Sequence, residues 1–263
     1  MRETLRYQPV QPLLGLADKV VYAQKESWGK CAAYQLSLSF LAGRNEKHKR
    51  PLIIFLCGGA FQALDRNAWI PELSYYAKRG FALASVEYST RATTKWPEQI
   101  QEIKQAIRFL RAHAEDFSID TERIAIMGES SGGYFAALAA LWGENRTHDA
   151  GPHPEQSSAL KAAVCFYPPV RITGNIPGIQ VDLTNFVDLC GEVTPQAPPF
   201  LLIHGSADTR VPLSQSEDLY GALQSAGVES TLCTVEGAGH ADAYFAQPEI
   251  KDRVLAFLDR HLR

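Results

Sequence analysis

The pentapeptide Gly-Glu-Ser-Ser-Gly at residues 128–132 places a serine hydroxyl where it can act as a nucleophile. It follows the apolar run Ile124–Met127 and precedes a helical pattern that ends near Trp142. A strand, a sharp turn and a helix in that order hold a serine on a strained turn with its hydroxyl exposed. The flanking glycines fit this geometry because the strand and helix backbones nearly touch. The pattern predicts Ser130 as the nucleophile of an acyl transfer.

A serine nucleophile needs a general base, which is itself oriented by an acid. Asp208 lies on the loop after the apolar strand pattern Phe200–Ile203, and His240 ends a glycine-rich loop, Glu236–His240, after the next predicted strand. Loops at the carboxyl ends of successive parallel strands gather at one edge of the sheet. We therefore expect Ser130, Asp208 and His240 to converge.

Each assignment has an alternative. Asp208 would also suit a turn that caps the following helix, and His240 would also suit an exposed loop. Asp182 and Asp242 compete for the role of the acid, although neither follows a strong strand pattern. His204 ends a core strand and is better explained as a buried structural histidine than as a base.

Acyl transfer also requires hydrogen-bond donors for the oxyanion that forms in the transition state. The backbone N–H of Ser131, which follows the nucleophile, is one expected donor. The others should come from the loop 57–61 (Cys-Gly-Gly-Ala-Phe), which follows the apolar strand Leu52–Leu56. Paired glycines let such a loop turn its N–H groups toward a substrate without a Cβ in the way.

Strand and helix patterns alternate along the chain, which predicts an α/β fold with a mostly parallel, eight-stranded sheet and helices on both faces. The predicted strands are Lys19–Ala23, Ala33–Phe40, Leu52–Leu56, Ala82–Val86, Ile124–Met127, Ala162–Phe166, Phe200–His204 and Ser230–Val235. The predicted helices are Ile70–Arg79, Glu98–Glu115, Gly133–Trp142, Ser214–Ala226 and Pro248–His261.

The pattern predicts one domain, 1–263, because no linker, repeat or low-complexity tract interrupts it. Two polar, proline-containing stretches escape the alternation, Gly143–Ser158 and Val170–Pro199. Irregular insertions of this length usually lie over functional sites. The second, with a short predicted helix at Val181–Leu189, would form a small lid.

Charge and composition exclude some classes of binding partner, among them nucleic acids and membranes. The formal net charge is −3, and the one charge run, Arg44–Arg50, lacks the aromatic residues and second basic stretch of a nucleic-acid site, so we expect a solvated loop there. The five cysteines are odd in number and never in C-x-x-C spacing, which favours reduced thiols. No apolar stretch is long enough for a signal or a membrane span, and we expect a cytoplasmic protein without a membrane partner.

Together these segments resemble the α/β-hydrolase esterases, and more narrowly the acetyl-xylan and feruloyl (carbohydrate) esterase-like branch allied to the hormone-sensitive-lipase group. The matching segments are Pro51–Phe61, Tyr75–Tyr88, Trp96–Ala114, Ile119–Gly133, Phe200–Pro212 and Gly237–His240. The resemblance implies Ser130 as nucleophile, His240 as base and Asp208 as its orienting acid. It also implies oxyanion donors at the main-chain N–H groups of Gly59, Ala60 and Ser131, and no metal or organic cofactor.

One residue departs from the family pattern. The family's oxyanion loop commonly opens with His-Gly-Gly, whereas this chain has Cys57 in place of the histidine. That histidine mainly braces the loop, so the substitution bears on loop geometry more than on chemistry. A small buried side chain at a strand end explains the cysteine better than a catalytic thiol does.

Members of this family that carry a helical cap take it largely from an N-terminal extension, and here only a short stretch precedes the first predicted strand. With the two polar insertions, the resemblance therefore implies a shallow cleft and esters of short acyl groups, acetyl to butyryl, on a polar alcohol such as a sugar. Trp69, Trp96, Tyr134 and Tyr244 lie near the predicted catalytic loops, where they would either stack on a sugar ring or pack internally. An amide hydrolase of the aryl formamidase kind and a non-catalytic binding protein are the alternatives. Both a monomer and a homodimer agree with the sequence.

Overall fold

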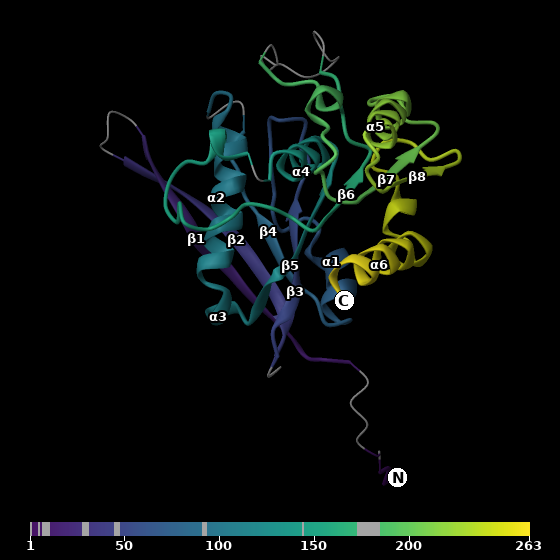
Figure 1. Ribbon diagram of the computed structural model, residues 1–263. Helices are drawn as coiled ribbons and strands as arrows, with labels where there is room; N and C mark the ends of the chain where they lie inside the picture. The colour runs from purple at the N-terminus through teal and green to yellow at the C-terminus, as the bar shows by residue number, and fades with distance from the viewer. Residues whose placement is uncertain are drawn as a thin grey trace.

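One eight-stranded sheet forms the centre of the molecule (Figure 1). The computed structural model describes residues 2–4, 6, 11–27, 32–44, 48–90, 94–143, 145–172 and 185–263. The strands are β1 (Leu14–Ser27), β2 (Ala32–Gly43), β3 (Arg50–Leu56), β4 (Ala82–Val86), β5 (Ile119–Glu129), β6 (Ala162–Phe166), β7 (Phe200–Gly205) and β8 (Ser230–Val235). Their order across the sheet is β1-β2-β4-β3-β5-β6-β7-β8.

The predicted mostly parallel sheet is confirmed. β1 and β2 form an antiparallel pair at one edge, β2 is antiparallel to β4, and all other neighbours are parallel. The central strand β3 is buried at every position, which explains its continuous apolar run. Because β3, β5, β6, β7 and β8 run in one direction, the loops that follow them meet at the same edge of the sheet.

Helices cover both faces of the sheet, as predicted. They are α1 (Ile70–Ala77), α2 (Glu98–Ala112), α3 (Ala114–Phe117), α4 (Ser131–Leu141), α5 (Ser214–Ser225) and α6 (Pro248–Leu262), with 3-10 turns η1 (Arg146–His148), η2 (Leu189–Glu192) and η3 (Ala243–Ala246). Side chains from α2, α4 and α5 join one buried cluster, and those from α1 and α6 join the other. None of the helices in the described ranges is long and apolar enough to cross a membrane.

Several elements differ from the sequence prediction; for example, β5 begins at Ile119 rather than at Ile124. β1 begins at Leu14 rather than at Lys19, since register shifts at two points hide its alternation. The helix predicted to reach Glu115 stops at Ala112, where His113 leaves helical geometry and the short α3 begins. The helix predicted at Val181–Leu189 is wrong in its described part, because residues 185–188 are not helical; residues 181–184 lie outside the described residues.

A buried charge cluster ties the insertion after α4 to α2. Lys104 and Arg108, one turn apart on α2, have fully buried side chains, and both contact Asp149 Oδ1, at 2.9 and 3.2 Å. Arg146 contacts the other oxygen of that carboxylate at 3.3 Å. Lys104 Nζ also donates to the carbonyl of Trp142, at 3.1 Å. One carboxylate therefore fixes the start of the polar insertion against the helix layer.

Removing that carboxylate's charge should destabilise the fold. In Asp149→Asn, two buried cations lose their counter-ion, so we expect the free energy of unfolding to fall by about 3–5 kcal/mol. Urea denaturation measures the change. The control is Asp116→Asn, whose side chain is 75% exposed beside His113 and whose loss should leave the denaturation midpoint unchanged. Equal midpoints for the two variants would contradict a structural role for the cluster.

Candidate active site

The turn between β5 and α4 holds Ser130 in a strained conformation. Its φ of 54° and ψ of −124° are unusual for a residue with a side chain. Its N–H donates to the carbonyl of Phe166 at 3.0 Å, which ties the turn to the end of β6. A Cβ on Gly132 would overlap the carbonyl of Leu56, the last residue of β3. Glycine at 132 therefore allows the helix that follows Ser130 to start against the neighbouring strand.

The structure brings Ser130, His240 and Asp208 into one hydrogen-bonded chain. Ser130 Oγ lies 2.9 Å from His240 Nε2, and His240 Nδ1 lies 2.6 Å from Asp208 Oδ2. The Asp208 side chain is fully buried, whereas that of His240 is 12% exposed. With Nδ1 donating to the carboxylate, Nε2 can accept the serine proton. This geometry permits proton transfer from Ser130 to an oriented imidazole.

Asp208 serves two sets of donors. Its Oδ1 accepts the N–H groups of Arg210 and Val211, both at 2.9 Å, while Oδ2 faces His240. Asp208 can therefore cap the turn that follows it and orient His240 at the same time. Asp242, the described competitor, instead accepts the N–H of Tyr244 at 2.8 Å from an exposed position. Asp182 lies outside the described residues.

His204 is buried beside this chain and has partners at both ring nitrogens. Nδ1 lies 2.7 Å from Ser216 Oγ and Nε2 lies 2.8 Å from the carbonyl of Val211. Burial lowers the pKa of the imidazole, with the facing charge of Asp208 acting in the opposite direction. His204 is thus placed as a neutral structural residue, as the sequence predicts.

The loop after β3 lies against the serine turn. Gly59 N–H donates to Ser131 Oγ at 3.0 Å, so this predicted oxyanion donor is engaged by a neighbouring hydroxyl. Within the described residues, the N–H groups of Ala60 and Ser131 have no recorded acceptor. Ala60 and Phe61 both have positive φ, 55° and 62°, which marks a sharply turned backbone. Ala60 and Ser131 are therefore the two predicted donors available to a substrate oxygen.

Cys57 is buried at the start of this loop and is unsuited to nucleophilic chemistry. Burial raises the pKa of its thiol to about 12, and the nearby charge of Glu129 adds to the shift. A protonated thiol can donate weakly, and Sγ lies 3.7 Å from Glu129 Oε1. The carbonyl of Cys57 accepts the Tyr88 hydroxyl at 2.7 Å. Tyr88, which follows β4, and Glu129, at the end of β5, thus brace the residue that stands in place of the family histidine.

Two residues around the site escaped the sequence analysis. Glu129, within the serine pentapeptide, is 7% exposed and accepts the N–H of Gly58. Tyr167, which follows β6 with a φ of 37°, packs its ring 4.8 Å from that of His240. The variable position in G-x-S-x-G gives no signal for the first, and a φ above zero at tyrosine cannot be read from sequence.

Aromatic side chains fill the space beside the loop and the serine helix. Phe186 packs against Phe61 and Tyr134, with ring centroids 4.9 and 5.3 Å away, and against Trp96 at 5.1 Å. Tyr134 is fully buried and donates to the carbonyl of Val187, so it cannot stack on a sugar. Of the four predicted stacking residues, Tyr134 and Trp96 therefore contribute to this aromatic cluster.

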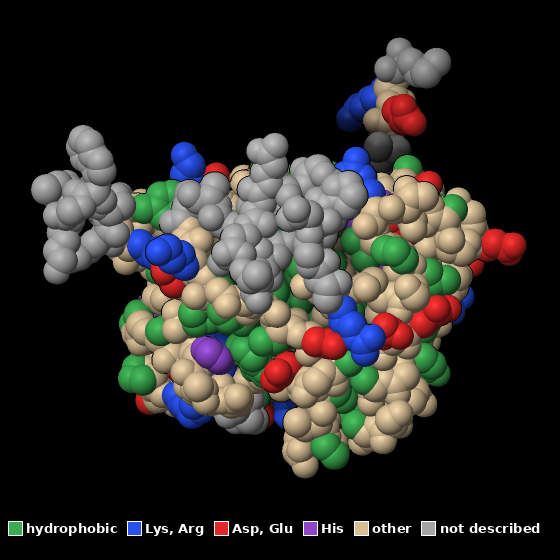
Figure 2. All heavy atoms as spheres, turned by 90° about the horizontal axis from the view of Figure 1, so that it is seen from above, with side chains coloured by type: hydrophobic (Ala, Val, Ile, Leu, Met, Phe, Trp, Pro, Cys, Tyr) green, Lys and Arg blue, Asp and Glu red, His purple; other side chains and the backbone are tan. Residues whose placement is uncertain are grey.

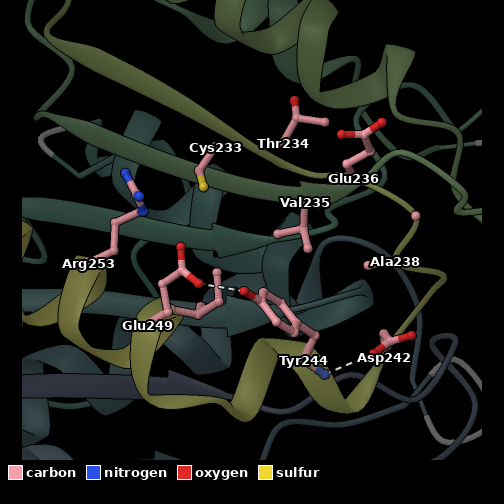
Figure 3. A pocket seen from close by; sticks show the side chains of 11 residues that line it. Cys233, Thr234, Val235, Glu236, Ala238, Asp242, Tyr244, Glu249 and Arg253 are labelled. Atoms are coloured by element: carbon pink, nitrogen blue, oxygen red, sulfur yellow. Dashed lines mark hydrogen bonds between the residues drawn. The ribbon is translucent and has the colours of Figure 1, made fainter.

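The other two predicted stacking residues line two separate cavities. Trp69 lines a small cavity between α1 and α6, and Tyr244 lines a cleft of about 530 Å³ between β8 and α6 (Figure 3). The loop 236–238, which leads to His240, forms one wall of that cleft.

In the view from above, acidic and basic side chains are interspersed on the described part of the surface (Figure 2). No group of three or more His, Cys, Asp or Glu among the described residues could hold a metal ion.

Comparison with protein families identifies two matching segments. The family model BD-FAE matches residues 38–176, which is more than half of the chain and includes the loop after β3 and the serine turn. The model of the prolyl oligopeptidase family matches residues 179–263, which include Asp208 and His240. The two matches together cover every residue of the hydrogen-bonded chain.

Known proteins similar to this chain are esterases. Esterase LipQ of Mycobacterium tuberculosis is 28% identical over 227 residues, which cover 79% of this chain and 53% of LipQ, so the chain spans about half the length of that relative. A truncated carbohydrate esterase from gut microbiota superposes with a TM-score of 0.79 at 25% identity, covering 94% of this chain and 96% of the other. The propionate-bound esterase Est2 of Thermogutta terrifontis superposes with a TM-score of 0.75 at 25% identity, covering 94% and 93%. These superpositions confirm the α/β-hydrolase fold.

The close approach at Gly132 can be tested through stability. Gly132→Ala places a methyl group against the Leu56 carbonyl, and we expect the free energy of unfolding to fall by about 1–3 kcal/mol. Gly221→Ala is the matched control, because Gly221 lies inside α5 with nothing within 4 Å of its Cβ position. Alanine should stabilise that helix by about 0.5–1 kcal/mol. Urea denaturation compares the two, and a stabilised Gly132→Ala would contradict the contact.

Proposed function

The chain belongs to the BD-FAE family and has the α/β-hydrolase fold, and we propose that it is a carboxylic ester hydrolase that cleaves esters of short acyl groups through an acyl-enzyme on Ser130. The observation that carries the proposal is the continuous chain Ser130–His240–Asp208, with contacts of 2.9 and 2.6 Å. A hydroxyl, an imidazole and a buried carboxylate in this order are the groups that acyl transfer requires.

The proposed reaction proceeds in two halves. Ser130 Oγ attacks the ester carbonyl carbon while its proton passes to His240 Nε2, and Asp208 stabilises the imidazolium that forms. The N–H groups of Ala60 and Ser131 donate to the developing oxyanion. Cleavage of the C–O bond releases the alcohol, which takes the proton from His240. A water molecule then repeats the sequence on the acyl-enzyme and releases the carboxylic acid.

Packing beside Ser130 supports a short acyl group. Tyr134 lies one turn after the nucleophile, Phe61 lies two residues after Gly59, and Phe186 packs on both. We propose that these rings limit the length of the acyl chain that the site accepts. The bound propionate of the Thermogutta esterase supports the same size range, and the gut carbohydrate esterase supports a sugar as the alcohol.

An amide bond is the second candidate substrate. The match of residues 179–263 to the prolyl oligopeptidase family favours it, because the same serine, histidine and aspartate would serve an amide. An aryl formamide is the small amide that the sequence leaves open as an alternative. The relative LipQ and the superposed structures are esterases, so the ester remains the preferred proposal.

A chain-length series tests the proposed function. We expect p-nitrophenyl acetate and butyrate to be hydrolysed with higher kcat/KM than the octanoate, because the aromatic packing limits the acyl chain. Ser130→Ala should lower kcat by about 10⁵–10⁶-fold on each ester, since the three residues act as a unit. Formanilides, assayed in parallel, distinguish an amide hydrolase. Turnover that persists in Ser130→Ala would contradict the nucleophile, and no turnover of any substrate would favour the binding-protein alternative.

The acid can be identified by a pair of isosteric variants. Asp208→Asn keeps the turn acceptor for Arg210 and Val211 but presents the wrong group to His240 Nδ1, and we expect kcat to fall roughly 10³–10⁴-fold. Asp242→Asn changes an exposed cap on η3 and should leave kcat unchanged. Steady-state hydrolysis of p-nitrophenyl acetate measures both. A larger loss in Asp242→Asn would transfer the assignment to that residue.

A further inference from the structure

Tyr167 has a backbone conformation that tyrosine adopts only at a cost. It follows Phe166, the last residue of β6, and its φ of 37° lies in the left-handed region that favours glycine. Its N–H donates to the carbonyl of Ile203 in β7 at 2.8 Å, so the sheet holds the residue in this conformation. The serine turn is adjacent, because the N–H of Ser130 donates to the carbonyl of Phe166. Strained residues with side chains gather at functional sites, and Tyr167 lies at the edge of this one.

The Tyr167 ring fills the space between His240 and Phe245. Its centroid lies 4.8 Å from that of the imidazole and 4.7 Å from that of Phe245, with interplanar angles of 63° and 53°. Tyr167 is fully buried, and Phe245 is 2% exposed. Phe245 belongs to η3, which follows the loop of His240. One ring therefore contacts both the base and the segment that comes after it.

Packing is sparse along the loop that carries His240. Gly237 and Gly239 both precede the histidine, and nothing among the described residues lies within 4 Å of the position that a Cβ would take on either. Ala238, between them, is anchored through its carbonyl, which accepts the N–H of Ala207 at 3.0 Å. The loop backbone is thus held before Gly239, and the imidazole depends on side-chain contacts for its orientation.

Hydrogen bonds alone leave one rotation of the imidazole weakly controlled. Asp208 Oδ2 and Ser130 Oγ lie 2.6 and 2.9 Å from the two ring nitrogens of His240. A rotation about the line through Nδ1 and Nε2 keeps both distances and tilts the plane of the ring, so it changes only the angles of the hydrogen bonds. The Tyr167 ring resists this tilt, because the tilt would drive a carbon edge of the imidazole into close-packed atoms or away from them.

We propose that Tyr167 is a positioning residue whose ring fixes the tilt of the His240 imidazole, so that Nε2 directs its lone pair at Ser130 Oγ. This inference rests on the proposed acyl transfer. The same orientation serves the second step of the imidazole, since the protonated Nε2 must point at the oxygen of the leaving alcohol. Proton transfer from or to a misdirected nitrogen is slower, whereas binding of the ester does not require that nitrogen. Loss of the ring should therefore lower kcat and leave KM nearly unchanged.

Two variants separate the ring of Tyr167 from its hydroxyl. The hydroxyl is buried and has no hydrogen-bond partner among the described residues. Tyr167→Phe removes it and keeps the ring, so we expect the wild-type kcat and no fall in Tm. Tyr167→Leu removes the ring and keeps an apolar side chain on the same strained backbone. We expect its kcat for p-nitrophenyl acetate to fall about 10–100-fold, as for a misplaced catalytic group.

Phe257 provides the matched control for Tyr167→Leu. Its ring packs on His261 within α6 with nearly the same geometry, a centroid distance of 4.7 Å and an angle of 61°, and it is 7% exposed. Phe257→Leu should lower Tm, as Tyr167→Leu does, because each leaves a space in the same buried cluster. It should keep the wild-type kcat. Circular dichroism gives Tm, and kcat is measured at a temperature where every variant is folded.

Three results would overturn the proposal. They are a Tyr167→Leu variant with the wild-type kcat, a Tyr167→Phe variant that loses as much kcat as Tyr167→Leu, and equal losses of kcat in Tyr167→Leu and Phe257→Leu. The first would show that the ring is not needed, the second that the hydroxyl acts instead, and the third that kcat only follows stability.

Phosphorylation by paraoxon separates this inference from the proposed ester function, because it also requires His240 to accept the proton of Ser130. A burst of p-nitrophenolate and the intact mass follow the reaction. A wild type that is phosphorylated at Ser130 without hydrolysing any ester, with slower phosphorylation in Tyr167→Leu than in Tyr167→Phe, would uphold the positioning role and refute the substrate. A wild type that reacts with neither reagent would overturn both.

Discussion

The contact between the start of α4 and the end of β3 is the constraint on which the site depends. Gly132 brings the helix backbone against the Leu56 carbonyl, and this approach forces Ser130 into its strained turn. It also sets the first N–H groups of α4 beside the loop that continues from Leu56. The proposed nucleophile and the proposed oxyanion donors are therefore positioned by one backbone contact rather than by separate elements, which explains why a side chain is excluded there.

The remaining groups reach the serine because the strands are parallel. Asp208 follows β7 and His240 follows β8, and both loops end at the sheet edge where the turn after β5 lies. The sheet fixes where these loops start, but side-chain contacts fix where they end. Asp208 holds its own turn through Oδ1, and Tyr167 packs against the imidazole that Asp208 orients. The His240 ring is thus held by Asp208 at Nδ1 and by the Tyr167 ring that packs against it.

The sequence predicts most of this arrangement because its signals are local. Continuous apolar runs identify β3 and β7, and glycines identify the serine turn and the loop after β3. Its failures have physical causes as well. Register shifts conceal the start of β1, and Tyr134, assigned as a possible stacking residue, is buried because its helix is covered by the segment around Phe186. Contacts between segments distant in sequence leave no periodic pattern in either one.

Buried charge separates the structural from the functional parts of this molecule. Lys104 and Arg108 are buried with a carboxylate partner and several carbonyl acceptors, so their charges are paired within the fold and fix an insertion. Glu129 is buried with only an N–H, a thiol and phenols at neutral pH. None of the ion pairs of the described residues gives it a lysine or arginine partner, because Lys251, which lines the same small cavity, pairs with Glu72. The contrast explains why an uncompensated carboxylate beside the nucleophile is consistent with function although it works against stability.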